Sequence, residues 1–499
     1  MSFAITLPPP LSAQAPPIEE LIVTSSRIPQ PLWRIGTSVS VLSGTEIDAH
    51  GNLILTDVLR QLPGIAVSGN GGAGKATTLR IRGEEGFRTL TIMDGIRLSD
   101  PSGPQIMPLL EHQLSGGLGR VEVLRGPQGL GYGADAGGVL AISSRQNGGG
   151  MNAMLDAQTG RYGTRQYSAN LGGGNERVDF SLSALDFQTE GFNTFVPDQT
   201  LADNDGYANT TLHGRLGVAL SEAWRMELVR RQVKGDNQLD NCFLTDVTHN
   251  CADTYDLQAS RAALQYESAA FSHAFSYAST DTGRENFAEG ISVFTTAGEL
   301  ERWEYLGSAR ALPGFDLVFG ADLERSDFNE GGRDNLGYYL EYLSDFSDSL
   351  SLSAGARYDD NDDFGANTSY RLSGAYLFTL GGGTVKLKGS YGTGFRAPSP
   401  YEIAYNAGAF AYPPASLVNL AQEKSRGAEA GLEYFTADGL HLEAVYFDQK
   451  VEDAIYFDLS SFSGYLQDAG LSRSRGIELS GQFHLSETVD VSVNYTYND

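Results

Sequence analysis

From about residue 150 to the end, apolar and polar residues alternate along the chain with a period of two. Every second residue of 178–183 is apolar, residues 489–497 repeat the pattern, and residues 271–277 carry Phe, His, Phe and Tyr at alternate positions. Because successive side chains of a β-strand point to opposite faces of its sheet, this pattern predicts many strands with one apolar and one polar face.

The connections between these predicted strands alternate between two lengths. Tight connections lie at residues 172–176, 221–223, 267–269, 313–314, 347–349, 381–383, 437–439 and 486–488. Longer polar loops lie between them, at about 190–206, 235–253, 284–297, 328–335, 359–366 and 397–423. Short turns on one side and long loops on the other are typical of an outer-membrane β-barrel. A soluble β-sandwich would not sort its loops in this way, and the repeat of roughly 40–50 residues that a β-propeller would show is missing.

The pattern gives about 17 strands, whereas single-chain bacterial barrels have an even number. An odd number would leave Asp499 on the outer side, and the chain stops within a good strand without a terminal aromatic residue. An open sheet in lipid would carry unsatisfied edges. We therefore expect a mainly β protein, a transmembrane antiparallel β-barrel with a truncated C-terminus, whose 22 strands would need about 100 more residues.

Residues 28–145 follow a different pattern, that of a small mixed α/β domain. Apolar residues from Leu55 to Leu62 recur at helical spacing, and Pro63 and Gly64 would end that helix. Strand-like runs follow at residues 78–82, 88–93, 121–124 and 139–143. The segment 106–114 is compatible with a short helix.

The amino end contains two further segments. Residues 1–15 end in Ala13, Gln14 and Ala15, a small-x-small cleavage pattern, behind a short apolar stretch without basic residues. We interpret them as the back half of an export signal, with a disordered Pro-rich tail as the alternative. The following residues 21–24 are strong β formers. They predict either a loose strand that can pair with the edge of a partner sheet or the first strand of the next domain.

Composition excludes several classes of protein. The 499 residues include 62 acidic and 35 basic ones, a net charge of −27, so no nucleic acid is expected as a partner. No apolar run approaches the ~18 residues of a transmembrane helix. The seven histidines are scattered, and the GxSxG and HExxH motifs are missing, so the sequence does not indicate an enzyme.

Cys242 and Cys251 are the only cysteines and lie in one polar segment. Two unrelated free thiols are one interpretation. A close pair in a loop, with no other cysteine in the chain, fits a disulfide in an oxidising compartment better. The spacing does not match that of a CxxC metal site.

Motifs in their order along the chain resemble those of the TonB-dependent outer-membrane receptors. The residues that resemble the TonB box are Glu20, Leu21, Ile22, Val23 and Thr24. Plug-domain motifs are matched at residues 56–64, 79–83, 93–98, 121–127 and 132–133, and barrel motifs at residues 392–398, 422–425 and 475–478. The similarity covers nearly the whole chain, and the plug motifs in this order are highly specific.

The resemblance implies both the organisation and the activity of the chain. Residues 1–15 would be the residual signal peptide, 16–28 the TonB box and tether, 29–147 the plug domain, and 148–499 the incomplete barrel. The protein would be a monomeric transporter in the outer membrane of a Gram-negative bacterium, surrounded by lipid. Its external loops would capture a scarce nutrient, and TonB would pair with the box and use the inner-membrane proton gradient to shift the plug. A mobile strand that adds to a partner sheet would provide that contact.

Within the family, the early outer loops resemble most those of the cobalamin (vitamin B12) receptors, with ferric-siderophore receptors as the alternative. In cobalamin receptors, acidic residues of these two loops bind calcium and order the substrate loops. By position, the matching residues here are Asp203, Asp205, Asp240, Asp253 and Asn193. Asn193 stands where that family has an aspartate, which would lower the affinity. Carboxylates at i and i+2 beside a glycine can share one hard cation, and a solvated acidic loop is the alternative.

The family also buries charge pairs between plug and barrel. By position, Arg82 and Arg125 match the plug arginines, and Glu429 and Glu478 match the barrel glutamates. In residues 428–434 the glutamates face the lumen if the apolar residues face lipid. Such pairs would hold the plug as a latch, and ordinary solvated lumen charge is the alternative.

Two further interpretations are rejected. Residues 69–77 nearly match a P-loop, but Ala76 occupies the Ser/Thr position, and residues 78–82 predict a strand where a P-loop opens a helix. We interpret this segment as a flexible plug loop. A passive porin would lack the plug motifs and the TonB box.

Overall fold

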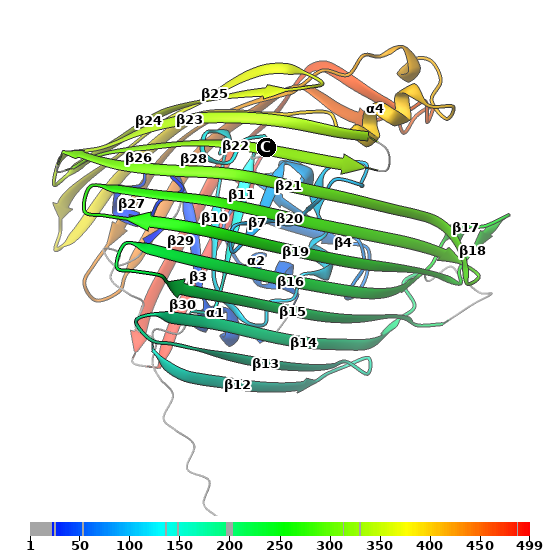
Figure 1. The fold of residues 1–499 in the computed structure, drawn as a ribbon, viewed down its shortest axis with the longest axis horizontal. Helices are drawn as coiled ribbons and strands as arrows, with labels where there is room; N and C mark the ends of the chain where they lie inside the picture. The colour runs from blue at the N-terminus through cyan, green and yellow to red at the C-terminus, as the bar shows by residue number, and fades with distance from the viewer. Residues whose placement is uncertain are drawn as a thin grey trace, which may run out of the picture.

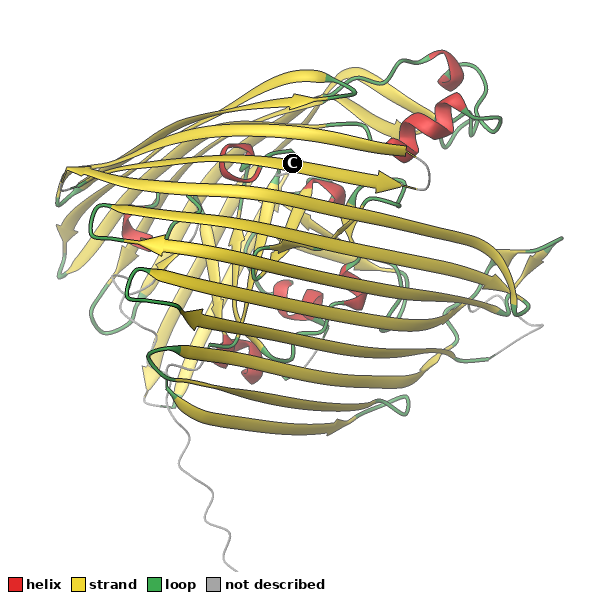
Figure 2. Ribbon diagram, viewed as in Figure 1, coloured by secondary structure: helices red, strands yellow, loops and turns green. Residues whose placement is uncertain are grey.

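A computed structural model describes residues 22–23, 26–51, 54–134, 137–146, 149–195, 203–312, 314–328, 331–486 and 488–499. Most of these residues are in strands, and the few helices are short (Figure 2). Across these described ranges, no helix combines the length and the apolar character that crossing a membrane would require.

The largest element is an antiparallel sheet of 17 strands, which confirms the predicted number and fold class. The strands are β12 (Gly150–Thr159), β13 (Arg165–Gly174), β14 (Val178–Phe192), β15 (Asp205–Ala219), β16 (Trp224–Leu239), β19 (Cys251–Glu267), β20 (Phe271–Ala288), β21 (Ile291–Leu312), β22 (Phe315–Phe328), β23 (Gly331–Ser347), β24 (Leu350–Asn361), β25 (Gly365–Leu380), β26 (Gly383–Arg396), β27 (Glu423–Phe435), β28 (His441–Phe457), β29 (Tyr465–Ser486) and β30 (Val489–Asn498). Each pairs with the next, and β12 and β30 stand at the two ends of the order. Figure 1 shows the sheet curving around the N-terminal domain.

The connections follow the predicted alternation, with three differences. All eight tight turns lie where the sequence placed them. The long loops expected at 284–297 and 328–335 were wrong, because the strands continue through most of these residues. In the first case Asn286 pairs with Phe294, and only a tight turn at Glu289 and Gly290 remains. β-Branched and aromatic residues such as Ile291 favour this extension of the ladder. The long loop expected at 359–366 is a turn of residues 362–364, because β24 continues to Asn361 and β25 begins at Gly365.

Burial alternates along the barrel strands as the sequence predicted. In β27, Glu429 and Glu433 are buried towards the lumen, whereas Leu432 between them is 45% exposed on the outer face. The lumen face of the barrel therefore carries charged residues that can meet the enclosed domain.

The enclosed N-terminal domain, here called the plug, contains a five-stranded sheet in the order β3-β10-β11-β6-β7. Its strands and those of the smaller pairs are β1 (Ile22–Val23), β2 (Gln30–Pro31), β3 (Val39–Ser43), β4 (Ile65–Gly69), β5 (Thr77–Ile81), β6 (Thr89–Met93), β7 (Ile96–Arg97), β8 (Ser99–Asp100), β9 (Met107–Pro108), β10 (Leu118–Leu124) and β11 (Gly138–Ser144). The helices of the described residues are α1 (Gly44–Ala49), α2 (Leu55–Leu59), α3 (Gly129–Tyr132), α4 (Pro400–Ala407), η2 (Leu32–Arg34), η3 (Gly86–Arg88), η4 (Leu110–His112) and η5 (Ala415–Leu417).

The predicted plug elements are present, except for the helix in segment 106–114. This segment forms β9 and then the three-residue η4. Pro108 lacks a backbone N–H and disfavours a helical conformation at Met107, which explains why a longer helix does not form there.

The apolar core of the plug continues into the barrel wall. Val229 and Val233 of β16 and Leu257 of β19 belong to the same buried cluster as Val121 and Val123 of β10. The plug therefore packs against the wall through apolar contacts as well as through the charges described below.

Candidate functional site

The described part of the predicted TonB box, Ile22 and Val23, forms a short strand, β1, that pairs with β2. In β1, Ile22 pairs with Pro31 and Val23 pairs with Gln30 of β2. Glu20, Leu21 and Thr24, the other residues of the predicted box, lie outside the described residues. The segment is thus seen in the extended, edge-pairing conformation that strand addition to another sheet requires.

All four residues of the predicted plug–barrel latch come together in the structure. Arg82 donates two hydrogen bonds to Glu478, from Nε to Oε1 at 2.9 Å and from Nη2 to Oε2 at 2.8 Å, and its Nη1 donates to Glu429 Oε2 at 2.7 Å. Arg125 Nη1 donates to Glu478 Oε2 at 3.1 Å. Their side chains are at most 4% exposed. Arg125 thus contacts Glu478, and Arg82 alone joins both glutamates.

The backbone around the latch is shaped to bring these charges together. Gly64 has a φ of +74°, and a Cβ there would lie 2.2 Å from Glu478 Oε1. Arg82 has a φ of 54°, a conformation that non-glycine residues rarely adopt, and its N–H donates to Gly64 O at 2.7 Å. Burial lowers the pKa of Arg82, but Glu429 and Glu478 outweigh this effect and raise it above its usual value.

Three more arginines of the tether and plug contact barrel glutamates, and sequence analysis missed them. The distances are 2.6 Å between Arg27 Nη2 and Glu304 Oε2, 3.0 Å between Arg88 Nε and Glu423 Oε2, and 2.8 Å between Arg97 Nη1 and Glu324 Oε2. Alternation along β21 places Glu304 on the lumen face, and this was the available signal. The alternation does not say which plug residue each glutamate meets.

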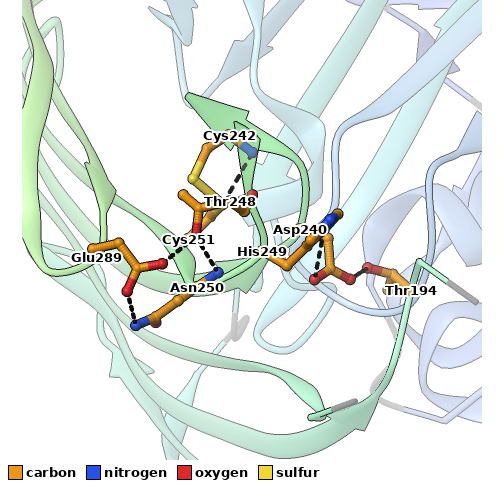
Figure 3. The surroundings of a disulfide bond; sticks show 8 residues. All are labelled: Thr194, Asp240, Cys242, Thr248, His249, Asn250, Cys251 and Glu289. Atoms are coloured by element: carbon orange, nitrogen blue, oxygen red, sulfur yellow. Dashed lines mark hydrogen bonds and ion pairs between the residues drawn. A yellow bond between two sulfur atoms is a disulfide. The ribbon is translucent and has the colours of Figure 1, made fainter. Parts of the chain in front are cut away.

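The predicted calcium ligands are brought together only in part. Thr194 donates to Asp205 Oδ2 from its backbone N at 2.6 Å and from its hydroxyl at 2.7 Å, and the same hydroxyl lies 3.4 Å from Asp240 Oδ2. Asp240 Oδ1 is 3.7 Å from His249 Nδ1 (Figure 3). Burial and the Asp205 carboxylate raise the pKa of Asp240. A cation between these two carboxylates would relieve their repulsion.

The other three predicted ligands have different surroundings. Asp203 is exposed, and Asn193 Oδ1 accepts the backbone N–H of Phe195 at 2.8 Å. Asp253 Oδ2 accepts from Asn237 Nδ2 at 3.0 Å. Among the described residues, no group of three or more His, Cys, Asp or Glu side chains is placed to hold a metal ion. The arrangement fits a two-carboxylate site with the Thr194 hydroxyl, and it does not fit a five-ligand set.

Cys242 and Cys251 form a disulfide with a Cα–Cα distance of 5.9 Å. It closes the base of a hairpin made of β17 (Cys242–Phe243) and β18 (Val247–Thr248), which projects from one end of the barrel in Figure 1. Asn250 Nδ2 donates to Glu289 Oε2 at 3.1 Å, and Thr248 also bonds Glu289 (Figure 3). The hairpin, which carries His249 and follows Asp240, is thus fixed at its base and to the β20–β21 turn.

The long connection between β26 and β27 presents an uncharged apolar surface. Residues 403–422 contain no charged side chain, although the chain carries a net charge of −27. Phe410 and Leu417 in this connection are 81% and 79% exposed. Figure 1 places its helix α4 at the same end of the barrel as the β17–β18 hairpin. An uncharged apolar surface at this end favours contact with an uncharged apolar molecule.

Comparison with protein families supports the two-part architecture. The family model described as TonB dependent receptor-like, beta-barrel, matches residues 113–499, and the one described as TonB-dependent Receptor Plug Domain matches residues 31–140. Among characterised proteins, the Vitamin B12 transporter BtuB of Photobacterium profundum is 26% identical over 428 residues. The match covers 83% of this chain but only 66% of that protein, slightly less than two thirds of its length.

Solved structures show the same fold. A mutant ferric enterobactin receptor (PfeA) from Pseudomonas aeruginosa, in complex with enterobactin, superposes with a TM-score of 0.76 at 18% identity, covering 93% of this chain and 81% of that one. The siderophore receptor PirA from Acinetobacter baumannii gives a TM-score of 0.74 at 16% identity, covering 93% and 80%.

Proposed function

The chain belongs to the TonB-dependent receptors, and we propose that it imports a scarce nutrient across the outer membrane of a Gram-negative bacterium with energy supplied through TonB. The observation that carries this proposal is a plug enclosed by the barrel sheet and held there by buried, hydrogen-bonded ion pairs. The plug closes the passage through the barrel, and the outer membrane has no energy source of its own. Another protein must therefore supply the work of moving the plug by direct contact.

The geometry suggests how a pull on the tether would reach the plug. Within the described part of the chain, Ile22 and Val23 pair with two residues of β2, so a partner strand would compete there for few hydrogen bonds. Arg27 follows within a few residues and is paired with Glu304. Further along, Leu32 O accepts from Lys386 Nζ at 2.9 Å. Force applied at β1 would therefore act first on the Arg27–Glu304 ion pair and then on the Lys386–Leu32 hydrogen bond, before it moves the plug itself.

We propose cobalamin as the cargo. The similarity to a vitamin B12 transporter supports this choice, and so does the charge of the loop end. Asp203, Asp240 and Asp360 lie in or beside three of its connections and are at least partly exposed, and the connection between β26 and β27 is apolar and uncharged. An anionic ferric chelate would meet repulsion there. A ferric-siderophore receptor is the second candidate, because the solved structures with the same fold are described as a siderophore receptor and a ferric enterobactin receptor.

We also propose that one calcium ion binds between Asp205 and Asp240. When bound, it would supply the positive charge that this carboxylate pair lacks. Asp205 is held by Thr194, and Asp240 precedes the disulfide-closed hairpin, so both carboxylates are positioned before binding. Titration of the purified protein with calcium chloride should release or absorb heat, and Asp240→Asn should abolish that signal. If neither protein gives a signal, the site does not exist.

Ligand-binding titrations on the purified receptor in detergent test the cargo. Cobalamin should bind with submillimolar or better affinity, and added calcium should increase that affinity. A ferric catecholate chelate should not bind. Binding of the ferric chelate without binding of cobalamin would establish the second candidate instead.

A further inference from the structure

The glycine-rich plug loop between β4 and β5, residues 69–77, packs against the outer barrel loop that carries Asp205. A Cβ at Gly71 would lie 2.8 Å from Thr194 Cγ2, and one at Gly74 would lie 2.1 Å from the ring of Tyr207. Gly74 also has a φ of +78°. The glycines of this P-loop-like sequence thus allow the plug backbone to approach the barrel loop closely.

This approach brings the ammonium group of Lys75 into a site made only of oxygen atoms. Lys75 Nζ donates to Asn237 Oδ1 at 2.6 Å, to Asp205 O at 3.2 Å and to Gly206 O at 3.3 Å. The residue is 4% exposed. Three donors meet three acceptors, so the ammonium group is fully satisfied. Main-chain and amide carbonyl oxygens are also the atoms that commonly bind hard cations in proteins.

The Lys75 site connects the two predicted calcium-binding loops. Asp205 and Gly206 begin β15, after the first loop. Asn237, near the end of β16, accepts from Lys75 and also donates to Asp253 at the start of β19. It thus connects the lysine to both strands that flank the second loop. Burial lowers the pKa of Lys75, and the charges of Asp205, Asp253 and Asp240 oppose that shift. The same three aspartates therefore stabilise the charged lysine.

We propose that Lys75 is a built-in cation for these two outer loops and orders them as a bound metal ion would, so that their order depends on the position of the plug. Asp253 then needs no metal, which explains why it lies with Asn237 and apart from the Asp205–Asp240 pair. Withdrawal of residues 69–77 with the plug would remove the cation and loosen both loops. The inference concerns these loops and is independent of the cargo.

The test measures the order of the second loop without any transport assay. Chymotrypsin, whose sites do not include lysine, should cleave at Phe243 or Leu244 when the loop opens, and the fragments are read after reduction of the disulfide. In wild-type protein with excess EDTA, cleavage should be slow. In Lys75→Met it should be at least about tenfold faster, the effect of losing hydrogen bonds to a charged group, and added calcium chloride should slow it again.

Controls separate this role from general damage. Lys75→Arg keeps the charge and should stay resistant, and Lys234→Met removes an exposed lysine of β16 that pairs with Asp256 and should match wild type. Gly74→Ala keeps the lysine but displaces the loop from Tyr207, and should behave like Lys75→Met even if that variant folds poorly. Equal cleavage rates in wild type and Lys75→Met, or rapid cleavage of wild type in EDTA, would overturn the proposal.

Discussion

At the scale of single residues, Arg82 is the side chain that joins plug and barrel most directly. Among the residues that the structure describes, it is the one that hydrogen-bonds both latch glutamates, and its guanidinium also lies 4.6 Å from the centre of the Phe447 ring. Its carbonyl oxygen accepts from the Ser474 hydroxyl. Removing its charge would leave two buried carboxylates without their main partner.

We therefore predict that Arg82→Met destabilises the docked plug by roughly 3–5 kcal/mol, the usual cost of breaking a buried pair on one side. The plug of the variant should unfold at a lower denaturant concentration, measured by its protease sensitivity in detergent. Arg80→Met, two residues earlier in β5, is the control, because Arg80 is partly exposed and bonded to Glu85. Equal behaviour of the two variants would show that the latch does not hold the plug.

Glu111 gives a second prediction, on pH dependence. Burial, with a contribution from Asp253, raises the pKa of this plug carboxyl to about 7. The folded protein thus favours the protonated carboxyl, whereas in the unfolded chain this carboxyl ionises near its ordinary pKa of 4.5. Between about pH 4.5 and pH 7 this difference lowers the free energy of unfolding by up to roughly 3 kcal/mol, at about 1.36 kcal/mol per pKa unit. Stability should be lost as the pH rises through this window.

Glu111→Gln should remove that loss. Its apparent unfolding temperature should equal that of wild type at pH 4 and exceed it at pH 8, with Glu85→Gln, at a half-exposed plug position, as the control. A constant difference between Glu111→Gln and wild type across this range would contradict the assignment.

At this scale, the sequence predicted which residues form the latch but not how they pair. The resemblance to the family identified Arg82, Arg125, Glu429 and Glu478 by position, and the alternation in residues 428–434 supported the lumen-facing position of Glu429. The pairing was not predictable, since it depends on the reach of Arg82 and on its positive φ. The surroundings of Asp253 were not predictable either. It was expected to share a cation with Asp240, but spacing along two loops does not show that Asp253 bonds Asn237, which in turn bonds Lys75.

At the scale of elements, the disulfide-closed hairpin of β17 and β18 determines how the second outer loop is presented. Its base lies next to Asp240, which is near Thr194, and Thr248 and Asn250, also close to the base, bond Glu289. Phe243 and Val247 on the hairpin are 65% and 61% exposed, so few packing contacts stabilise it apart from the disulfide.

We predict that Cys242→Ser with Cys251→Ser, or reduction of the wild type, loosens this hairpin by roughly 2–3 kcal/mol, as expected for closing a loop of about 10 residues. Hydrogen exchange of residues 242–250 should rise by about a hundredfold, while exchange in the β12–β14 strands stays unchanged. Unchanged exchange in the hairpin would show that hydrogen bonds alone order it.

Elements were the best-predicted level of the structure. Period-two alternation and turn residues located the strands and the eight tight turns expected between them, because each barrel strand is bounded by lipid on one face and lumen on the other. The errors lie where neither face is fixed, at the outer ends of β20 to β25 beyond the wall, and at Pro108, where one residue ends a helical pattern.

At the scale of the whole molecule, the plug and the sheet form one packed body. Apolar side chains of β16 and β19 complete the plug core, and at least five arginines of the tether and plug pair with barrel glutamates. Such a body can pass a large molecule only if the plug shifts or unfolds. External work through the tether is therefore central to the account.

Uptake of labelled cobalamin tests this claim most directly. Cells that lack their own receptor would express the gene, with wild-type sequence or with Val23→Pro in the box, in backgrounds with and without TonB. Proline removes a backbone donor from the edge strand, so strand pairing with TonB should fail. The account predicts uptake only for wild type with TonB present, with cobalamin still bound at the surface in the other cases. Uptake that persists without TonB, or surface binding of cobalamin that never leads to uptake in any background, would contradict it.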